Sequence, residues 1–287
     1  MNKQRNYGLN LELEKQHQKP EDWIFGAESK KCIAQIPPEE RRSYLPMGEV
    51  QRGVEDMMDC ASRGPINILE TKFTWLVRNH KLTSENLRWL KESGYVLLDN
   101  SVQFSDCFVA QNSGTTRQGN SMIAPLDAIR KQGLIPKKML PLESWMTWED
   151  YYNPNRITTT MRKLGNEFIL RLLINFERVL SSDFEEVYNQ DMIDMAGYAW
   201  PEPMGGEYPR TEDPFNHVFV GLYLPPHNIF DNYLDSVDGD FIKKLAKDYN
   251  LLDFGYRLFI TELQAKPEPQ KSAIRTFFSM WCREIIQ

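Results

Sequence analysis

The spacing of the apolar residues changes along this chain, and the change limits the folds that it can adopt. In residues 65–80 (PINILETKFTWLVRNH), apolar side chains such as Ile66, Leu69 and Phe73 recur at steps of three and four, the period of an amphipathic helix. From 215 to 262 the apolar runs are short, rich in β-branched and aromatic residues, and separated by Pro and Gly, as is typical of strands. This order predicts an α+β protein in which a helical half faces a sheet half.

Several helices can be placed before the strand-like region. The first should begin within a few residues of Cys60, because Pro65 fits only in the first turn of a helix. A second is expected in 83–94 (TSENLRWLKESG), where Thr or Ser caps its start and Gly ends it. A third, in APLDAIRKQGLIP, should close at Gly133, and the apolar stretch from about 157 to 182 predicts a largely buried fourth.

The chain divides into a lead-in, a main body and a tail. Residues 1–50 are polar and broken by prolines, which predicts an irregular N-terminal segment. The body, residues 51–264, should consist of the helical half (about 51–200) and the sheet half (about 201–264). The tail, residues 265–287, has a proline-containing spacer and then apolar residues at helical spacing. Such a stripe must be buried, against the body or against a protein partner.

The composition argues against several classes of protein. The net charge of −6 and the absence of a basic block disfavour a nucleic-acid partner. No apolar stretch approaches the ~18 residues that cross a bilayer, and the N-terminus lacks the apolar core of a signal peptide, so we expect no membrane association and a cytoplasmic location. The cysteines form no C-x-x-C pair and DSVDGD (235–240) lacks the ligand pattern of a calcium loop, so no metal site is expected. There are four cysteines: Cys32, Cys60, Cys107 and Cys282.

Cys60 and His217 stand at positions where a thiol enzyme would need them. A cysteine at a helix N-terminus lies at the positive end of the helix dipole, which favours the thiolate and predicts a lowered thiol pKa. His217 heads the strand-like run NHVFVGLYL, and either Asp231 or Asn232 could hold its imidazole. Cys, then His, then a carboxylate or amide is an order that a two-domain cysteine enzyme can use.

Four segments resemble the papain family of cysteine peptidases, in a divergent form. CASRGPINILE (60–70) has the family's spacing from the nucleophile to a helix glutamate, Glu70, and 105–136 is similar to the segment whose glycine backbone edges the substrate cleft. NHVFVGLYL resembles the family's D/N-H-A-V-x-x-V-G-Y, and IFDNYLD with FGYRLFI resembles I-x-N-S-W-G with G-Y-F/W-x-I. The match spans about 51–262, and the phrases around it resemble a papain-like group encoded by phages and little-studied bacteria.

The resemblance implies a helical half and a mainly antiparallel β half with a cleft between them. It further implies hydrolysis of peptide bonds through a thioester acyl-enzyme, without a cofactor. His217 would draw the proton from Cys60, Asp231 would orient the imidazole with Asn232 as the alternate, and Gln51 would steady the oxyanion together with the Cys60 N–H. A peptide or protein substrate would lie against three residues: Gly114, Gly119 and Asn216.

The sequence departs from the family around the nucleophile. Met57, Met58 and Asp59 replace the C-G-S/A sequence that precedes the family's cysteine, and no Trp follows it. The family's glutamine lies six residues before the cysteine, whereas Gln51 lies nine before Cys60 and would need a longer loop. Asp59 opposes formation of the Cys60 thiolate unless its side chain turns away.

Each candidate residue also has a structural interpretation. Cys60 can be a small core residue, His217 a buried structural histidine, and Gln51 a surface side chain. Gly114 and Gly119 can be ordinary turn glycines. Two other functions also fit these segments: a catalytically inactive papain-like component, for example of a phage particle, and a cysteine acyltransferase that passes the acyl group to an amine.

Overall fold

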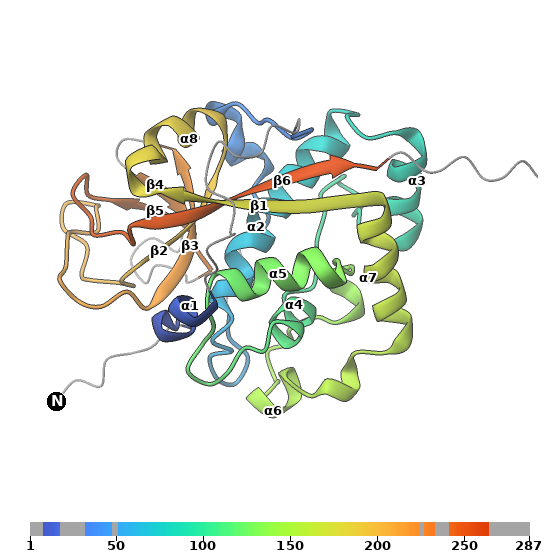
Figure 1. Ribbon diagram of the computed structural model, residues 1–287, viewed down its shortest axis with the longest axis horizontal. Helices are drawn as coiled ribbons and strands as arrows, with labels where there is room; N and C mark the ends of the chain where they lie inside the picture. Colours follow the sequence, from blue (N-terminus) through green and yellow to red (C-terminus); the bar gives the residue numbers. More distant parts are fainter. Residues whose placement is uncertain (1–7, 18–31, 48–50, 224–226, 233–240, 264–287) are drawn as a thin grey trace, which may run out of the picture.

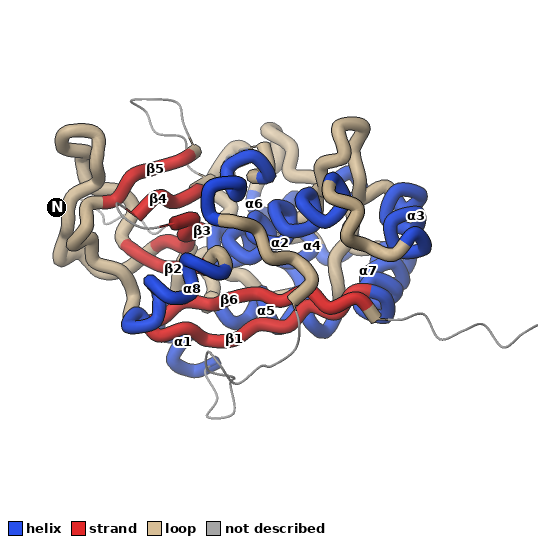
Figure 2. Tube along the Cα trace, turned by 90° about the horizontal axis from the view of Figure 1, so that it is seen from above, coloured by secondary structure: helices blue, strands red, loops and turns tan. Residues whose placement is uncertain are grey.

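The helices gather beside an antiparallel sheet, and the chain is of the α+β class, as the sequence predicts (Figure 1). Figure 2 shows the strands β2 to β5 on one side and the helices α3, α4 and α7 on the other, with α2 between them. Among the described residues, no helix is both long and apolar enough to cross a bilayer. The computed structural model describes residues 8–17, 32–47, 51–223, 227–232 and 241–263.

The sheet has six strands in the order β1-β6-β2-β3-β4-β5, and every neighbouring pair is antiparallel. Its longest pairing joins β1 to β6, from Leu172 opposite Glu262 to Leu180 opposite Phe254. Two strands, β1 and β2, come from before residue 201, so the chain enters the sheet earlier than that position. The strands are β1 (Leu172–Leu180), β2 (Ile193–Gly197), β3 (His217–Tyr223), β4 (His227–Phe230), β5 (Ile242–Leu245) and β6 (Phe254–Glu262).

The helix expected from 157 to 182 is wrong in its second half. Helix α7 covers Thr159–Arg171, and the chain then continues directly as β1. In LLINFERVL the side chains of Leu172, Ile174 and Phe176 are buried, while Leu173 and Asn175 between them are only partly buried. This alternation suits a strand, and pairing with β6 decides the structure of an apolar stretch that periodicity alone leaves ambiguous.

Helix α2 (Cys60–Arg78) is the central helix and packs directly on the sheet. Its start at Cys60 agrees with the prediction, but Pro65 lies in the second turn, where it has no N–H to give to the carbonyl of Ala61. One turn after Cys60, a Cβ on Gly64 would come within 2.0 Å of an Asp194 oxygen on β2. The glycine therefore allows the N-terminal end of α2 to approach the sheet closely.

The second and third predicted helices are confirmed with their caps. Helix α3 (Ser84–Ser93) begins at Thr83, whose side chain accepts a hydrogen bond from the Asn86 N–H, and ends at Gly94 in the left-handed region. Helix α5 (Ile123–Gln132) ends at Gly133. The remaining helices are α1 (Leu11–His17), α4 (Asp106–Asn112), α6 (Trp148–Tyr151) and α8 (Phe184–Gln190), with 3-10 turns η1 (Pro38–Tyr44), η2 (Lys137–Met139), η3 (Pro154–Arg156) and η4 (Ser181–Asp183).

Two apolar cores lie on the two faces of the sheet. The larger one joins α2, α5 and α7 to side chains such as Val218 and Val220, and the smaller one lies under α8 and includes Phe219 and Ile193. The lead-in contributes to this packing, because the buried Arg41 of η1 donates hydrogen bonds to two carbonyl oxygens, of Tyr188 and Leu222. The predicted tail helix in 265–287 lies outside the described residues.

Candidate active site

Cys60 is the first residue of α2, and its thiol is buried against strand β3. Only 1% of the residue is exposed. The backbone N–H of Val218, the residue after His217, donates a hydrogen bond to the thiol. The close packing of α2 on β3 therefore places the cysteine of the helical half beside the histidine strand of the sheet half.

His217 and Asp231 form a buried hydrogen-bonded pair. Nε2 of His217 lies 2.6 Å from Oδ1 of Asp231, and both side chains are fully buried. His217 opens β3, opposite Gly197 of β2, and Asp231 directly follows β4. Because β3 and β4 are paired neighbours, the sheet holds the imidazole and the carboxylate in a fixed relation.

Two further donors hold the second oxygen of Asp231. The Trp200 indole N–H and the Lys243 ammonium lie 3.0 Å and 2.9 Å from Oδ2. Burial alone would raise the pKa of Asp231, but the charges and hydrogen bonds of His217 and Lys243 together lower it below its ordinary value. The alternate third member, Asn232, accepts a hydrogen bond instead from Nδ2 of Asn67 on α2, at 2.7 Å.

The environment of Cys60 differs from the expectation of a lowered thiol pKa. Burial raises the pKa of Cys60 well above its ordinary value, and the negative charges of Asp56, Asp59 and Asp231 raise it further. The Val218 N–H acts in the opposite direction, but with less effect. In this arrangement desolvation outweighs the helix dipole, because a buried thiolate loses its hydration.

Asp59, the residue before the cysteine, turns its side chain away from the thiol. Its Oδ1 accepts a hydrogen bond from Nε of Arg63 at 2.9 Å, and its Oδ2 accepts one from the Tyr151 hydroxyl at 2.6 Å. Asp59 and Arg63 are both buried, so they form an ion pair inside the helical half. The side chain thus turns away as a Cys60 thiolate would require, but the Asp59 charge still raises the pKa of Cys60.

Gln51, the candidate oxyanion donor, is buried and bound to an acid that the sequence analysis missed. Its Nε2 donates to Oδ1 of Asp56 at 3.1 Å, and the Met58 N–H donates to the same oxygen at 2.8 Å. Burial is the main cause that raises the pKa of Asp56 to about 6. The only indication of this contact in the sequence is that Asp56 lies within the lengthened loop between Gln51 and Cys60.

The comparisons with known proteins concern the fold. No family model matches the sequence, and no curated protein does. Xylellain, a cysteine protease from Xylella fastidiosa, superposes with a TM-score of 0.54 at 13% identity, over 91% of this chain and 97% of that chain. Procathepsin B S9 from Trypanosoma congolense gives a TM-score of 0.50 at 10% identity, over 81% of this chain and 79% of that chain. This chain has the papain-like fold. The predicted fold class is thereby confirmed.

In this papain-like fold the N-terminal segment runs along the predicted substrate edge. Leu9 pairs in parallel with Asn120: the Asn120 N–H donates to Gly8 O, and the Asn10 N–H donates to Asn120 O, both at 2.8 Å. On the other side, the Leu9 N–H donates to the backbone oxygen of Asn216 at 3.3 Å. Residues 8–10 therefore bridge the two halves beside the candidate catalytic residues.

The two predicted edge glycines differ in their surroundings. A Cβ on Gly119 would meet Gly8 O at 2.1 Å, whereas nothing lies within 4 Å of a Cβ on Gly114. Gly8 itself is packed on the Met58 backbone, two residues before Cys60. Gly119 thus lies where a second backbone approaches closely, and Gly114 is an exposed turn glycine.

Glu14 anchors this segment to both halves of the protein. Its Oε2 accepts the Met122 N–H at 2.6 Å at the start of α5, and its Oε1 accepts the Tyr256 hydroxyl of β6 at 2.8 Å. Only 2% of Glu14 is exposed. Nothing in the polar sequence of the lead-in indicated that one of its acids would be buried.

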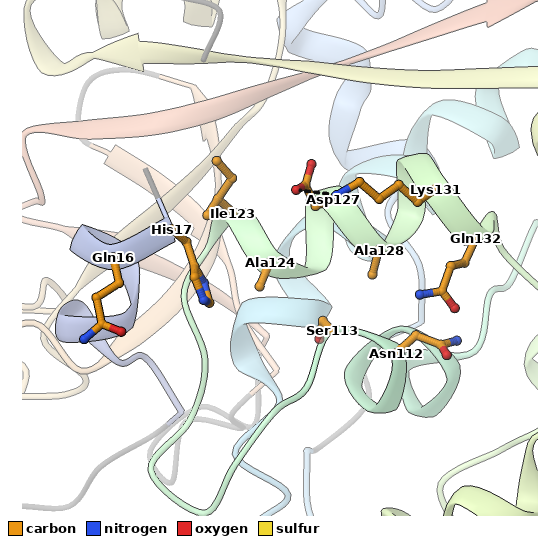
Figure 3. Close-up of a pocket in the computed structure, with 10 residues that line it drawn as sticks. All are labelled: Gln16, His17, Asn112, Ser113, Ile123, Ala124, Asp127, Ala128, Lys131 and Gln132. Atoms are coloured by element: carbon orange, nitrogen blue, oxygen red, sulfur yellow. Dashed lines mark hydrogen bonds and ion pairs between the residues drawn. The ribbon is translucent and has the colours of Figure 1, made fainter. Parts of the chain in front are cut away.

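A cavity of about 410 Å³ lies beside α1, away from the candidate catalytic residues (Figure 3). It is lined by side chains of α1, α4 and α5, and His17 on its wall is hydrogen-bonded through Nδ1 to the Ser121 hydroxyl at 2.7 Å. Its lining does not include Cys60, His217 or Asp231. Within the described ranges, no three His, Cys, Asp or Glu side chains are grouped as a metal ion would require.

Proposed function

We propose that this chain is a cysteine peptidase in which Cys60 is the nucleophile, His217 the base and Asp231 the residue that orients the base. The observation that carries the proposal is the buried 2.6 Å bond between His217 and Asp231, at the strand whose Val218 N–H binds the Cys60 thiol. Three side chains of the required types, from α2, β3 and the end of β4, converge on one place.

On this proposal each imidazole nitrogen of His217 has its own role. Nε2 of His217 is engaged by Asp231, so Nδ1 takes the proton from Sγ of Cys60. The sulfur then forms a bond to the substrate carbonyl carbon, and His217 returns the proton to the amine as the C–N bond breaks. Water, activated by the same nitrogen, hydrolyses the thioester and restores the thiol.

The negative oxygen of the tetrahedral intermediate needs hydrogen-bond donors. The Cys60 backbone N–H, at the first position of α2, is one candidate. The Gln51 carboxamide is the other candidate, and its Nε2 also donates to Oδ1 of Asp56.

An extended peptide backbone is the proposed substrate. The hydrogen bonds that residues 8–10 make to Asn120 and to the Asn216 oxygen support this, because they use main-chain groups that recognise a peptide independently of its side chains. On this proposal, the N-terminal segment must leave the edge before a substrate can take its place.

The test is hydrolysis of a fluorogenic peptide mixture by the full chain, with mass spectrometry after reaction with a peptidyl epoxysuccinate. We expect hydrolysis that Cys60→Ser abolishes and Cys32→Ser leaves intact, and a single adduct on Cys60. Cys32 is a suitable control because it is a half-buried cysteine outside the site.

The second candidate is a papain-like protein without catalysis. The raised pKa of the buried Cys60 thiol favours it, since a neutral thiol is a poor nucleophile. If neither hydrolysis nor a Cys60 adduct is observed, including when the N-terminal segment is loosened by mutation, this second candidate replaces the first.

A further inference from the structure

Lys243 is a buried lysine whose ammonium lies against the carboxylate of the candidate triad. It stands on β5 opposite Ile229 of β4, and only 3% of the residue is exposed. Its Nζ lies 2.9 Å from Oδ2 of Asp231 and 5.4 Å from the centre of the Trp200 ring. The same ring meets the His217 imidazole edge to face, with centroids 5.8 Å apart.

A carboxylate beside a buried imidazole has two effects on it. It holds the ring in one orientation, and it favours the protonated ring by direct charge attraction. A base that must accept and release a proton in each cycle needs the first effect but is hindered by an excess of the second. A cation on the far oxygen of the carboxylate removes the excess while keeping the orientation.

We propose that Lys243 is a positioning residue that fixes the far oxygen of Asp231 and balances its charge, so that the two side chains together present His217 with an acceptor of no net charge. The inference rests on the proposed function, because it assigns His217 the role of base. Since Lys243 does not touch the reacting atoms, it acts only through Asp231.

The other titratable groups around His217 do not supply this balance. Cys60 on α2 and Asp56 in the preceding loop approach from the helical half, and Tyr249 lies near Asp231 on the sheet side. Each of these groups is neutral when protonated and negative when ionised. Of the groups named here, Lys243 alone can oppose a negative charge on Asp231, and the lowered pKa of Asp231 agrees with a carboxylate that remains ionised beside it.

The test compares Lys243→Met with Lys244→Met. The control is the next residue on the same strand, and its partly exposed side chain pairs with Glu207 at 2.7 Å. The readout is the NMR titration midpoint of the His217 imidazole, identified by its loss in His217→Gln. We expect Lys243→Met to raise this midpoint by about one pH unit or more, about a tenfold gain in proton affinity, and Lys244→Met to leave it in place.

A double variant tests the same inference if Lys243→Met does not fold. Asp231→Asn alone leaves the Lys243 charge unbalanced and should lower the His217 midpoint. Asp231→Asn combined with Lys243→Met contains no unpaired buried charge, so its midpoint should return to near that of the wild type, and alkylation of Cys60 should recover with it. Equal midpoints in the double variant and in Asp231→Asn would overturn the inference.

The two hypotheses fail in different ways. If the His217 midpoint does not move in a folded Lys243→Met protein, the positioning role is wrong, whatever the peptidase assay shows. If the midpoint moves as expected but no peptide is hydrolysed, Lys243 balances the charge of Asp231 as inferred, and the proposed peptidase activity fails.

Discussion

The two sides of the candidate site each hold a carboxyl group, and the pKa values of the two groups move in opposite directions. Asp231, on the sheet side, has its pKa lowered because His217 and Lys243 oppose the effect of burial. Asp56, on the helix side, receives its hydrogen bonds from neutral donors, Gln51 and the Met58 N–H, and burial raises its pKa to about 6. A cationic partner, rather than burial alone, therefore decides the direction in which the pKa of a carboxyl group shifts here.

The comparison also separates the side of the site that fits the proposed catalysis from the side that does not. On the sheet side the imidazole and its carboxylate are already hydrogen-bonded. On the helix side the Cys60 thiol is buried, and its pKa is raised by burial and by the surrounding acids. We therefore expect that changes on the sheet side reduce activity, whereas changes that open or neutralise the helix side increase the reactivity of the thiol.

The largest effect is expected from Asp231→Ala. It leaves Lys243 buried without its carboxylate partner and His217 without its orienting bond, so the free energy of unfolding should fall by about 3–5 kcal/mol and peptide turnover by about 10³- to 10⁴-fold. Chemical denaturation and kcat measure the two effects. Asn232→Ala removes the acceptor for Asn67 and should cost about 1 kcal/mol with a small change in turnover. The reverse order would transfer the orienting role to Asn232.

A smaller but still clear effect is expected from Glu14→Ala, on the helix side. It removes the charged acceptor that ties α1 to Met122 and Tyr256, and such bonds contribute about 1.5–3 kcal/mol each. Residues 8–10 should then leave the edge more often, and alkylation of Cys60 by iodoacetamide at pH 7.5 should become at least about tenfold faster.

The matched control is Glu12→Ala on the same helix. Glu12 is exposed and pairs only with Lys15, among its described contacts, at 3.0 Å. Its removal should leave the alkylation rate unchanged. If Glu14→Ala and Glu12→Ala give the same rate as the wild type, docking of α1 does not limit access to Cys60.

The features of the site that depend on a single helix or strand could be predicted from the sequence. The start of α2 at Cys60, the strand that His217 opens and the caps of α3 follow from short-range patterns of apolar, capping and turn residues. The position of Asp231 came from the order of four family-like segments, and the structure brings it to His217.

Other parts depend on pairing between distant residues, which local patterns do not contain. The apolar sequence of strand β1 predicts a helix, because only its register with β6 distinguishes the two. Lys243 gave no signal, since a lysine on a short strand ordinarily faces water, and its burial follows from the pairing of β5 with β4. The bond between Gln51 and Asp56 depends on the path of a loop, and the burial of Glu14 depends on docking of the lead-in.

The smallest expected effect concerns Asp56. The pH dependence of stability that it causes has the opposite sign to that caused by Asp231 on the sheet side. The pKa of Asp56 rises from 3.8 to about 6 on folding, so between these values the folded protein holds a proton that the unfolded chain has lost. Stability should therefore fall as the pH rises from about 4 to about 6, by up to about 2–3 kcal/mol. The lowered pKa of Asp231 acts in the opposite sense, and its contribution is lost only as the pH falls below about 4.

Asp56→Asn should remove this fall, because the amide keeps an acceptor for Gln51 and Met58 but has no charge to desolvate. Urea unfolding at pH 4.5 and pH 7.5 measures the difference, and the variant should gain stability relative to the wild type mainly at the higher pH. The neighbouring Glu55→Gln is the control of opposite sign, since hydrogen bonds from the Trp148 N–H and Arg117 lower the pKa of the partly exposed Glu55. Glu55→Gln should therefore lose a little stability at pH 7.5.

The charge of Asp56 also raises the pKa of Cys60, so Asp56→Asn should speed alkylation of the thiol. If Asp56→Asn changes neither the alkylation rate of Cys60 nor the difference in the free energy of unfolding between pH 4.5 and pH 7.5, the charge of Asp56 does not lower the reactivity of the thiol.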